Sequence, residues 1–157
     1  MVARAVAAQE GWSILIASDE EAYRLALEFC PSERLKYLGF ISRGELLQLI
    51  HSVELVAVCS QYLDNYPTIG LEALVHGSIP FTTSSTGLAQ FFNTISPDLV
   101  LDPGQIPDLD KILDVGNSTK NQRLIAAESA SDMDAMIQDY LALIENEVIS
   151  QSREQRP

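Results

Sequence analysis

The feature that most constrains the fold is an alternation of apolar runs of strand length with segments of helical period. The apolar runs predict strands at residues 12–18, 34–40, 53–60, 79–84 and 98–102. The intervening segments predict helices at residues 2–9, 19–29, 42–52, 68–76, 87–92, 106–115 and 119–148. Strands and helices that alternate across short turns form a parallel sheet with helices on both faces. The sequence therefore predicts an α/β, doubly wound, Rossmann-like domain with a mostly parallel sheet.

Local patterns fix several helix ends. Ser42 stands in front of a helical segment with Glu45 three residues on, which predicts a capping box. Gly77 follows residues 68–76 and predicts the end of that helix. We expect one folded domain over residues 1–149 and a frayed tail over 150–157, which has almost no apolar content.

Composition excludes several classes of protein. The 157 residues carry a formal net charge of −12, which disfavours a nucleic-acid or anionic-membrane surface. Cys30 and Cys59 lie in apolar contexts without metal-ligand spacing, so we expect reduced, buried thiols and no metal site. No run is long enough to span a membrane, and the first residues do not resemble a signal peptide. These features predict a cytoplasmic protein, brought to the inner face of a membrane only through a partner.

The loop after the strand at 53–60 is where a doubly wound fold binds its ligand, at the carboxyl ends of the strands. Pro67 suits the first turn of the following helix, and the backbone amides of residues 65–69 could seat a phosphate. Asp64 stands outside this seat, and Glu72 could accept hydrogen bonds from two sugar hydroxyls. The plainer interpretation remains open, because Glu is a good helix former and Asp-Asn before Pro is ordinary turn chemistry.

Residues 35–87 resemble the nucleotide-sugar-binding half of a retaining GT-B glycosyltransferase of family 4, also called group 1. The resemblance rests on an ordered series of matches, closest over residues 34–90: Leu38, Gly39, Phe40, Glu45, Leu46, Leu47, Ser60, Asp64, Glu72, Ala73, Leu74, Gly77 and Pro80. The sequence "DNYP" before the helix also occurs in sugar transferases that build capsules and lipopolysaccharides. The resemblance implies a hexosyl transfer from a nucleoside diphosphate sugar to an unidentified acceptor, with retention of configuration and without a required metal or other cofactor.

The resemblance also assigns roles to residues. Glu72 would hold the ribose, and Asp64 would touch hydroxyls of the donor sugar, so both are placed in the catalytic site. The remaining nucleotide-sugar contacts would come from Gly39, Phe40, Ile41, Ser60, Asn65, Tyr66, Pro67, Thr68, Thr86 and Gly87.

Three departures from the family pattern weaken the expectation of activity. Asp64 replaces the usual Glu, and Thr86-Gly87 replaces a frequent Gly-Gly pair. The Arg and Lys that neutralise the diphosphate are missing, together with the first strand of this half and the whole amino-terminal half. We therefore expect weak nucleotide binding and little turnover from this chain alone, with a separate amino-terminal GT-B half or another subunit as its partner.

Two alternatives remain. The chain could be a non-catalytic binding or assembly module derived from a GT-B protein. Alternatively, residues 14–27 resemble the start of a response-regulator receiver, in which an acidic pair binds magnesium. A receiver also needs an Asp at the end of a central strand and a later Lys. The corresponding strand ends "VAVCS", and "FTTSSTG" has no Lys, so this alternative would be a degenerate receiver.

Overall fold

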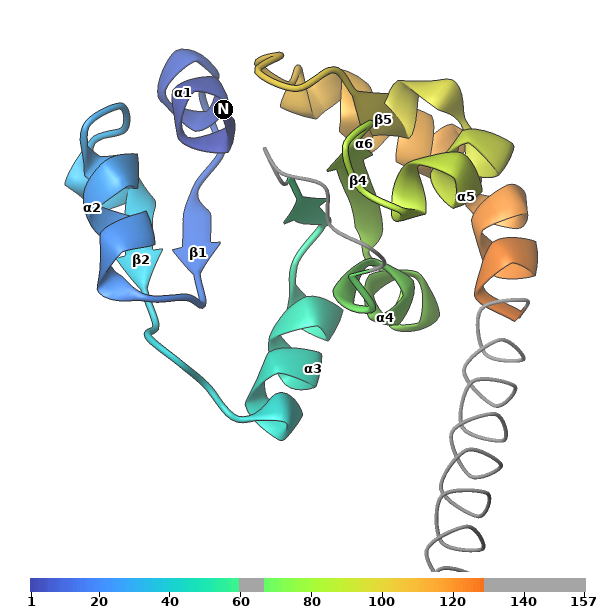
Figure 1. Ribbon diagram of the computed structural model, residues 1–157, viewed down its shortest axis with the longest axis horizontal. Coiled ribbons are helices and arrows are strands. Elements are labelled where there is room, and N and C mark those ends of the chain that lie inside the picture. Colours follow the sequence, from blue (N-terminus) through green and yellow to red (C-terminus); the bar gives the residue numbers. More distant parts are fainter. Residues whose placement is uncertain (60–66, 129–157) are drawn as a thin grey trace, which may run out of the picture.

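A computed structural model describes residues 1–59 and 67–128. The described elements alternate as the sequence predicts (Figure 1). In chain order they are α1 (Val2–Ala8), β1 (Ile14–Ile16), α2 (Glu20–Leu27), η1 (Ser32–Arg34), β2 (Leu35–Tyr37), α3 (Arg43–Ser52), β3 (Leu55–Val58), α4 (Ile69–Val75), β4 (Ile79–Thr83), α5 (Leu88–Ile95), η2 (Pro97–Leu99), β5 (Val100–Leu101) and α6 (Leu109–Ser118). Residues 120–128 are helical as well.

All described strand pairs are parallel, but the strands fall into two sheets. β1 pairs with β2, from Ile14 opposite Leu35 to Ile16 opposite Tyr37. β3 pairs with β4, which in turn pairs with β5. Figure 1 shows the two sheets side by side, with α3 leading from one to the other. The fold is therefore the predicted α/β, Rossmann-like type, with a break between β1 and β3.

The core lies mainly around β4. Helices α4, α5 and α6 pack on this strand, and all its residues are buried. Phe81, Leu88 and Phe92 are fully enclosed there. Phe92 is thus a core residue, while Phe91 lies partly buried at the edge of the same cluster.

The segment between α1 and β1 is bonded both to the start of α6 and to the residue just before β2. The Gln9 side chain donates to the carbonyl of Pro107 at 3.0 Å and accepts from the amide of Leu109 at 2.8 Å. Trp12 donates through Nε1 to the Asp110 carboxylate at 2.8 Å. Arg34, just before β2, donates to the carbonyls of Gln9 and Trp12. These bonds hold α1 against α6 on one side and against β2 on the other.

Arg123 fastens the last described helix to the core. Its guanidinium donates to the carbonyl of Gly116 at 2.9 Å and to that of Ser78 at 3.2 Å. Burial lowers the pKa of the Arg123 side chain, but a guanidinium stays charged at neutral pH. The contact places residues 120–128 against the start of β4.

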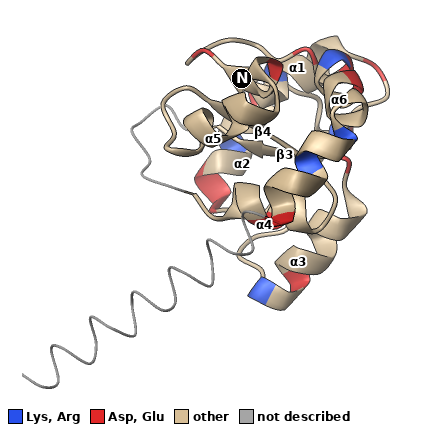
Figure 2. Cartoon of the chain, turned by 90° about the vertical axis from the view of Figure 1, so that its right-hand side faces the viewer, with Lys and Arg blue, Asp and Glu red and all other residues tan. Residues whose placement is uncertain are grey.

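The surface carries mixed charge. In the view of Figure 2, blue and red segments are interspersed over α1, α3 and α6 without a basic face. In the part of the chain that the structure describes, no helix combines the length and apolar character needed to cross a bilayer.

Candidate functional site at the α3–α4 edge

Two helices begin where strands end, and this brings their first turns to one edge of the molecule. α3 follows β2 through the loop 39–41, and α4 follows β3. The two helices pack against each other. We call this region, made of residues 39–41, Arg43, Thr68 and Glu72, the α3–α4 edge. Doubly wound folds in general bind their ligands at this edge, outside the carboxyl ends of the strands.

The central contact of this edge joins Arg43 to Glu72. Nη2 of Arg43 lies 2.7 Å from Oε1 of Glu72. The Glu72 side chain is 20% exposed, whereas that of Arg43 is 76% exposed. Glu72 therefore faces the rim of the molecule rather than the core. The Arg43 guanidinium is accessible to solvent, so it could also contact a ligand bound at this edge.

Sequence reasoning missed Arg43. One pattern could have found it, since Arg43 occupies the first position of α3 directly after the cap Ser42. A positive charge is unfavourable at a helix amino terminus, where the dipole already places positive charge. In this chain an acidic partner, Glu72, offsets the unfavourable position of the Arg43 cation.

The loop 39–41 carries an exposed aromatic ring. Gly39 has φ of 68°, a left-handed conformation that β-branched and bulky residues avoid. The turn leaves Phe40 86% exposed, the largest exposure among the exposed large apolar side chains of the described residues. A flat ring at this position can stack against the face of a base.

The first turn of α4 is fixed by its packing. Gly70 approaches α5 so closely that a Cβ atom there would lie 2.6 Å from Leu88 and 3.0 Å from Phe92. The amides of Gly70 and Leu71 donate to the carbonyls of Pro67 and Thr68. Pro67 is half-buried and Thr68 exposed. This packing sets the direction in which Glu72 points.

The loop after β4 lies beside the end of β3. The Thr82 hydroxyl donates to the carbonyl of Val58 at 2.7 Å and lies 2.6 Å from the hydroxyl of Thr86. Thr86 is buried and its hydroxyl donates to the carbonyl of Thr83, so its side chain points inward. Gly87 is exposed and begins α5. The threonines therefore support the carboxyl ends of β3 and β4.

Eight of the twelve residues expected at the site lie among the residues that the structure describes. Glu72 lies on α4, which packs against α3, the helix that follows the loop 39–41. Thr86 is linked through the Thr82 hydroxyl to the end of β3. Ser60, Asp64, Asn65 and Tyr66 lie outside the described residues.

The remaining titratable groups have structural roles. Burial raises the pKa of the Cys59 thiol to about 11, and burial also raises that of Cys30, so both are protonated at neutral pH. Nδ1 of His51 lies 3.2 Å from the carbonyl of His76, at the ends of α3 and α4. Asp19 accepts from the amide of Ala22, and Glu20 pairs with Arg24, so both acids serve the start of α2. Over residues 1–59 and 67–128, no cluster of His, Cys, Asp and Glu could hold a metal ion.

Comparison with known proteins identifies the fold. No known protein-family profile and no curated protein matches the sequence. The chain is similar to the crystal structure of Alr3699/HepE from Anabaena in complex with UDP, with a TM-score of 0.67 and 18% sequence identity. The match covers 90% of this chain and 44% of HepE, so this chain spans less than half of the protein that it resembles. The likeness shows a shared Rossmann-like α/β fold, consistent with one half of a GT-B molecule.

Proposed function

We propose that this domain binds a nucleoside diphosphate sugar and forms the donor half of a retaining GT-B hexosyltransferase. The observation that carries the proposal is the Arg43–Glu72 pair at the α3–α4 edge, in a fold shared with a protein crystallised with UDP. A half-buried carboxylate is a good acceptor for two neighbouring ribose hydroxyls, and an exposed arginine beside it suits the phosphates.

Each part of the edge suits one part of a nucleotide. Phe40 offers a ring for the base, and Glu72 offers a carboxylate for the ribose. Arg43 offers positive charge for the diphosphate, on which negative charge grows as the sugar leaves. Asp64, with Ser60, Asn65 and Tyr66, completes the sugar side of the proposal. No metal takes part in this scheme, and the acceptor would bind on a second half or subunit.

Arg43 adds a dependence on salt to the expectation of weak binding. The sequence lacks the arginine and the lysine that neutralise the diphosphate in the family that it resembles. Without them, no positive charge was expected beside the diphosphate. A guanidinium beside Glu72 supplies one positive charge at the same edge. We therefore expect binding of a nucleoside diphosphate to depend on salt, with affinity weaker than about millimolar for the chain alone.

Ligand-detected NMR with UDP, GDP and ADP tests the proposal. Glu72→Gln keeps the shape of the side chain but loses its charge, and should weaken binding by about tenfold or more. The matched control is Glu33→Gln in η1, which precedes β2 and therefore lies at the opposite end of that strand. Equal signals from the two variants would contradict the role of Glu72.

A second experiment separates the enzyme from a non-catalytic module. The chain is co-expressed with an amino-terminal GT-B half and assayed for transfer of labelled sugar. Transfer that is lost in Glu72→Gln and kept in Glu33→Gln supports the enzyme. Nucleotide binding that depends on Glu72 without any transfer favours the module.

A further inference from the structure

The carboxylate of Glu72 already has a partner in this structure, because Arg43 occupies part of it. Nη2 of Arg43 lies 2.7 Å from Oε1 of Glu72. A separation of this length is typical of a charge-assisted hydrogen bond. A ribose whose two hydroxyls bind this carboxylate must therefore share Oε1 with the guanidinium or take its place. The bond between Arg43 and Glu72 thus opposes a ligand that offers only hydroxyl groups.

The two helices that carry this ion pair are tied together at their other ends. Nδ1 of His51, near the end of α3, lies 3.2 Å from the carbonyl of His76, which follows α4. The Ser78 hydroxyl donates to the carbonyl of Val53, directly after α3, at 2.9 Å. These contacts hold α3 and α4 together independently of the ion pair. A rotation of the exposed arginine side chain can therefore open the pair without moving either helix.

The cost of opening the pair depends on what the ligand offers to Arg43. The Glu72 side chain is 20% exposed, so water only partly compensates for a lost counter-ion at its carboxylate. A nucleoside brings hydroxyl groups for Glu72 but no anion for the guanidinium. A nucleoside diphosphate brings both, because its phosphate oxygens accept the N–H groups that the carboxylate gives up. Only the phosphorylated ligand replaces both halves of the ion pair.

This difference discriminates between the two kinds of ligand. Apparent affinity falls in proportion to the fraction of molecules whose site is ready to bind. If Arg43 holds Glu72 in about nine of ten molecules, a nucleoside binds about tenfold more weakly than it would to an unpaired Glu72. A diphosphate avoids this loss, since it gives Arg43 a new anion. An unpaired charge in the complex with the wrong ligand is a general source of specificity.

We propose that the Arg43–Glu72 pair selects phosphorylated nucleotides over nucleosides, because Arg43 occupies Glu72 unless the ligand also engages Arg43. Arg43 is then a specificity-determining residue, whose bond to Glu72 weakens the binding of the unphosphorylated ligand. This role rests on the proposed function, in which Glu72 accepts ribose hydroxyls, and extends it to the protein before the ligand arrives.

NMR titrations with UDP and uridine test the selection in the wild type and in Arg43→Gln, which keeps much of the side chain but loses its charge. GDP with guanosine, or ADP with adenosine, replaces them if that diphosphate binds more tightly. Arg43→Gln should weaken binding of the diphosphate by about tenfold and strengthen binding of the nucleoside by about threefold. The preference for the diphosphate should therefore fall by about thirtyfold.

Two further variants show whether the effect belongs to this ion pair. Lys111→Gln is the matched control, because it also removes one positive charge and an ion pair of 2.7 Å, with Asp98. Asp98 lies in η2, just before β5, and hence at the amino end of its parallel sheet. Lys111→Gln should leave both dissociation constants unchanged. Arg43→Lys keeps the charge and should retain most of the preference for the diphosphate.

The outcomes separate the selection from the proposed function. A gain in affinity for the nucleoside is a result that a merely structural role of Arg43 would not produce. Equal weakening of nucleoside and diphosphate in Arg43→Gln would overturn the selection and leave the role of Glu72 intact. Undiminished binding of UDP in Glu72→Gln would contradict the proposed function itself.

Salt provides a second test, which needs no variant. Added salt screens the ion pair and also the attraction between Arg43 and phosphate. Raising the ionic strength from about 0.02 M to about 0.3 M should therefore strengthen the binding of uridine by about twofold and weaken that of UDP. Uridine binding that does not strengthen with salt in the wild type, or that strengthens equally in Arg43→Gln, would overturn the proposal.

Discussion

The two sheets of this molecule are made of similarly apolar sequence but are buried to different degrees. Every residue of β4 is buried, whereas no residue of β1 is. α5 buries Leu88, Ala89, Phe92 and Ile95, whereas α2 buries none of its residues. The strand sequences "SILI" and "IPFTT" do not predict this difference in burial.

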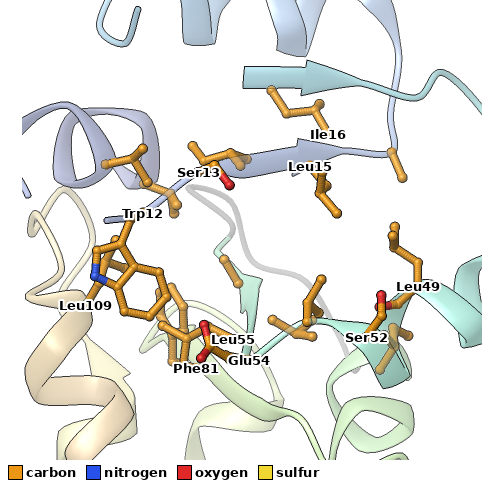
Figure 3. A pocket seen from close by; sticks show the side chains of 18 of the residues that line it. Trp12, Ser13, Leu15, Ile16, Leu49, Ser52, Glu54, Leu55, Phe81 and Leu109 are labelled. Atoms are coloured by element: carbon orange, nitrogen blue, oxygen red, sulfur yellow. The ribbon is translucent and has the colours of Figure 1, made fainter. Parts of the chain in front are cut away.

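The difference comes from neighbours. β4 has a strand on each side and three helices packed against it. Among the described residues, β1 pairs with one strand, and on its other side lies a cavity of about 760 Å³ lined by Leu15 of β1 and Leu55 of β3 (Figure 3). Burial of a strand thus depends on the completeness of its surroundings more than on its own hydrophobicity. The sheet β3–β5 and the helices packed on it should therefore contribute most of the free energy of unfolding.

Truncation of one leucine in each half gives the largest expected contrast. Leu88→Ala in α5 removes a side chain that is 0% exposed and should lower the free energy of unfolding by about 2–5 kcal/mol. Leu25→Ala in α2 removes one that is 52% exposed and should lower it by less than about 1 kcal/mol. Urea denaturation followed by circular dichroism measures both. Equal losses would show that the halves contribute alike.

Adding one methyl group should change the stability in opposite directions at a crowded glycine and at an open one. In Gly116→Ala, the new Cβ would lie 2.4–2.6 Å from three side-chain atoms of Ile79, so the change should destabilise by about 1–3 kcal/mol. In Gly44→Ala on α3, nothing lies within 4 Å, and the change should stabilise by about 0.5–1 kcal/mol. Thermal denaturation of the two variants distinguishes these outcomes. Stabilisation by Gly116→Ala would mean that α6 can move away from β4.

Sequence predicted the parts of the fold that depend on adjacent residues. The capping box of Ser42 and Glu45 is confirmed, with both bonds present. Gly77 ends α4 with φ of 88°, as expected for a glycine in that position. The strands are shorter than the apolar runs that predicted them, since β1 covers Ile14–Ile16 and β5 only Val100–Leu101. Pairing with a neighbour decides where a strand ends, and a single apolar run does not contain that information.

Contacts between residues far apart in the chain could not be predicted from the sequence. The bond between Trp12 and Asp110 joins residues 98 positions apart. The Arg43–Glu72 pair likewise depends on how α3 and α4 pack. A resemblance to a family predicted a site role for Glu72, but the arginine beside it became visible only in three dimensions. The same holds for the break in the sheet, because each strand on its own satisfies the pattern of a buried strand.

The smallest expected effect concerns the cap at the start of α3. Ser42→Ala removes the cap and should cost about 1 kcal/mol at neutral pH. The Glu45 carboxylate accepts from the Ser42 hydroxyl at 2.7 Å and from its amide at 2.8 Å, and these bonds lower the pKa of Glu45. A group with a lowered folded-state pKa stabilises above its unfolded pKa and loses this contribution as pH falls through the folded pKa. The gap in stability between wild type and Ser42→Ala should therefore narrow in acid, at about pH 3, without vanishing, because the Glu45 amide still donates to the Ser42 hydroxyl in the wild type. Denaturation of both proteins at the two pH values measures the gap. A gap that stays constant would show that the carboxylate adds nothing to the cap, and that packing against α4 holds this helix instead.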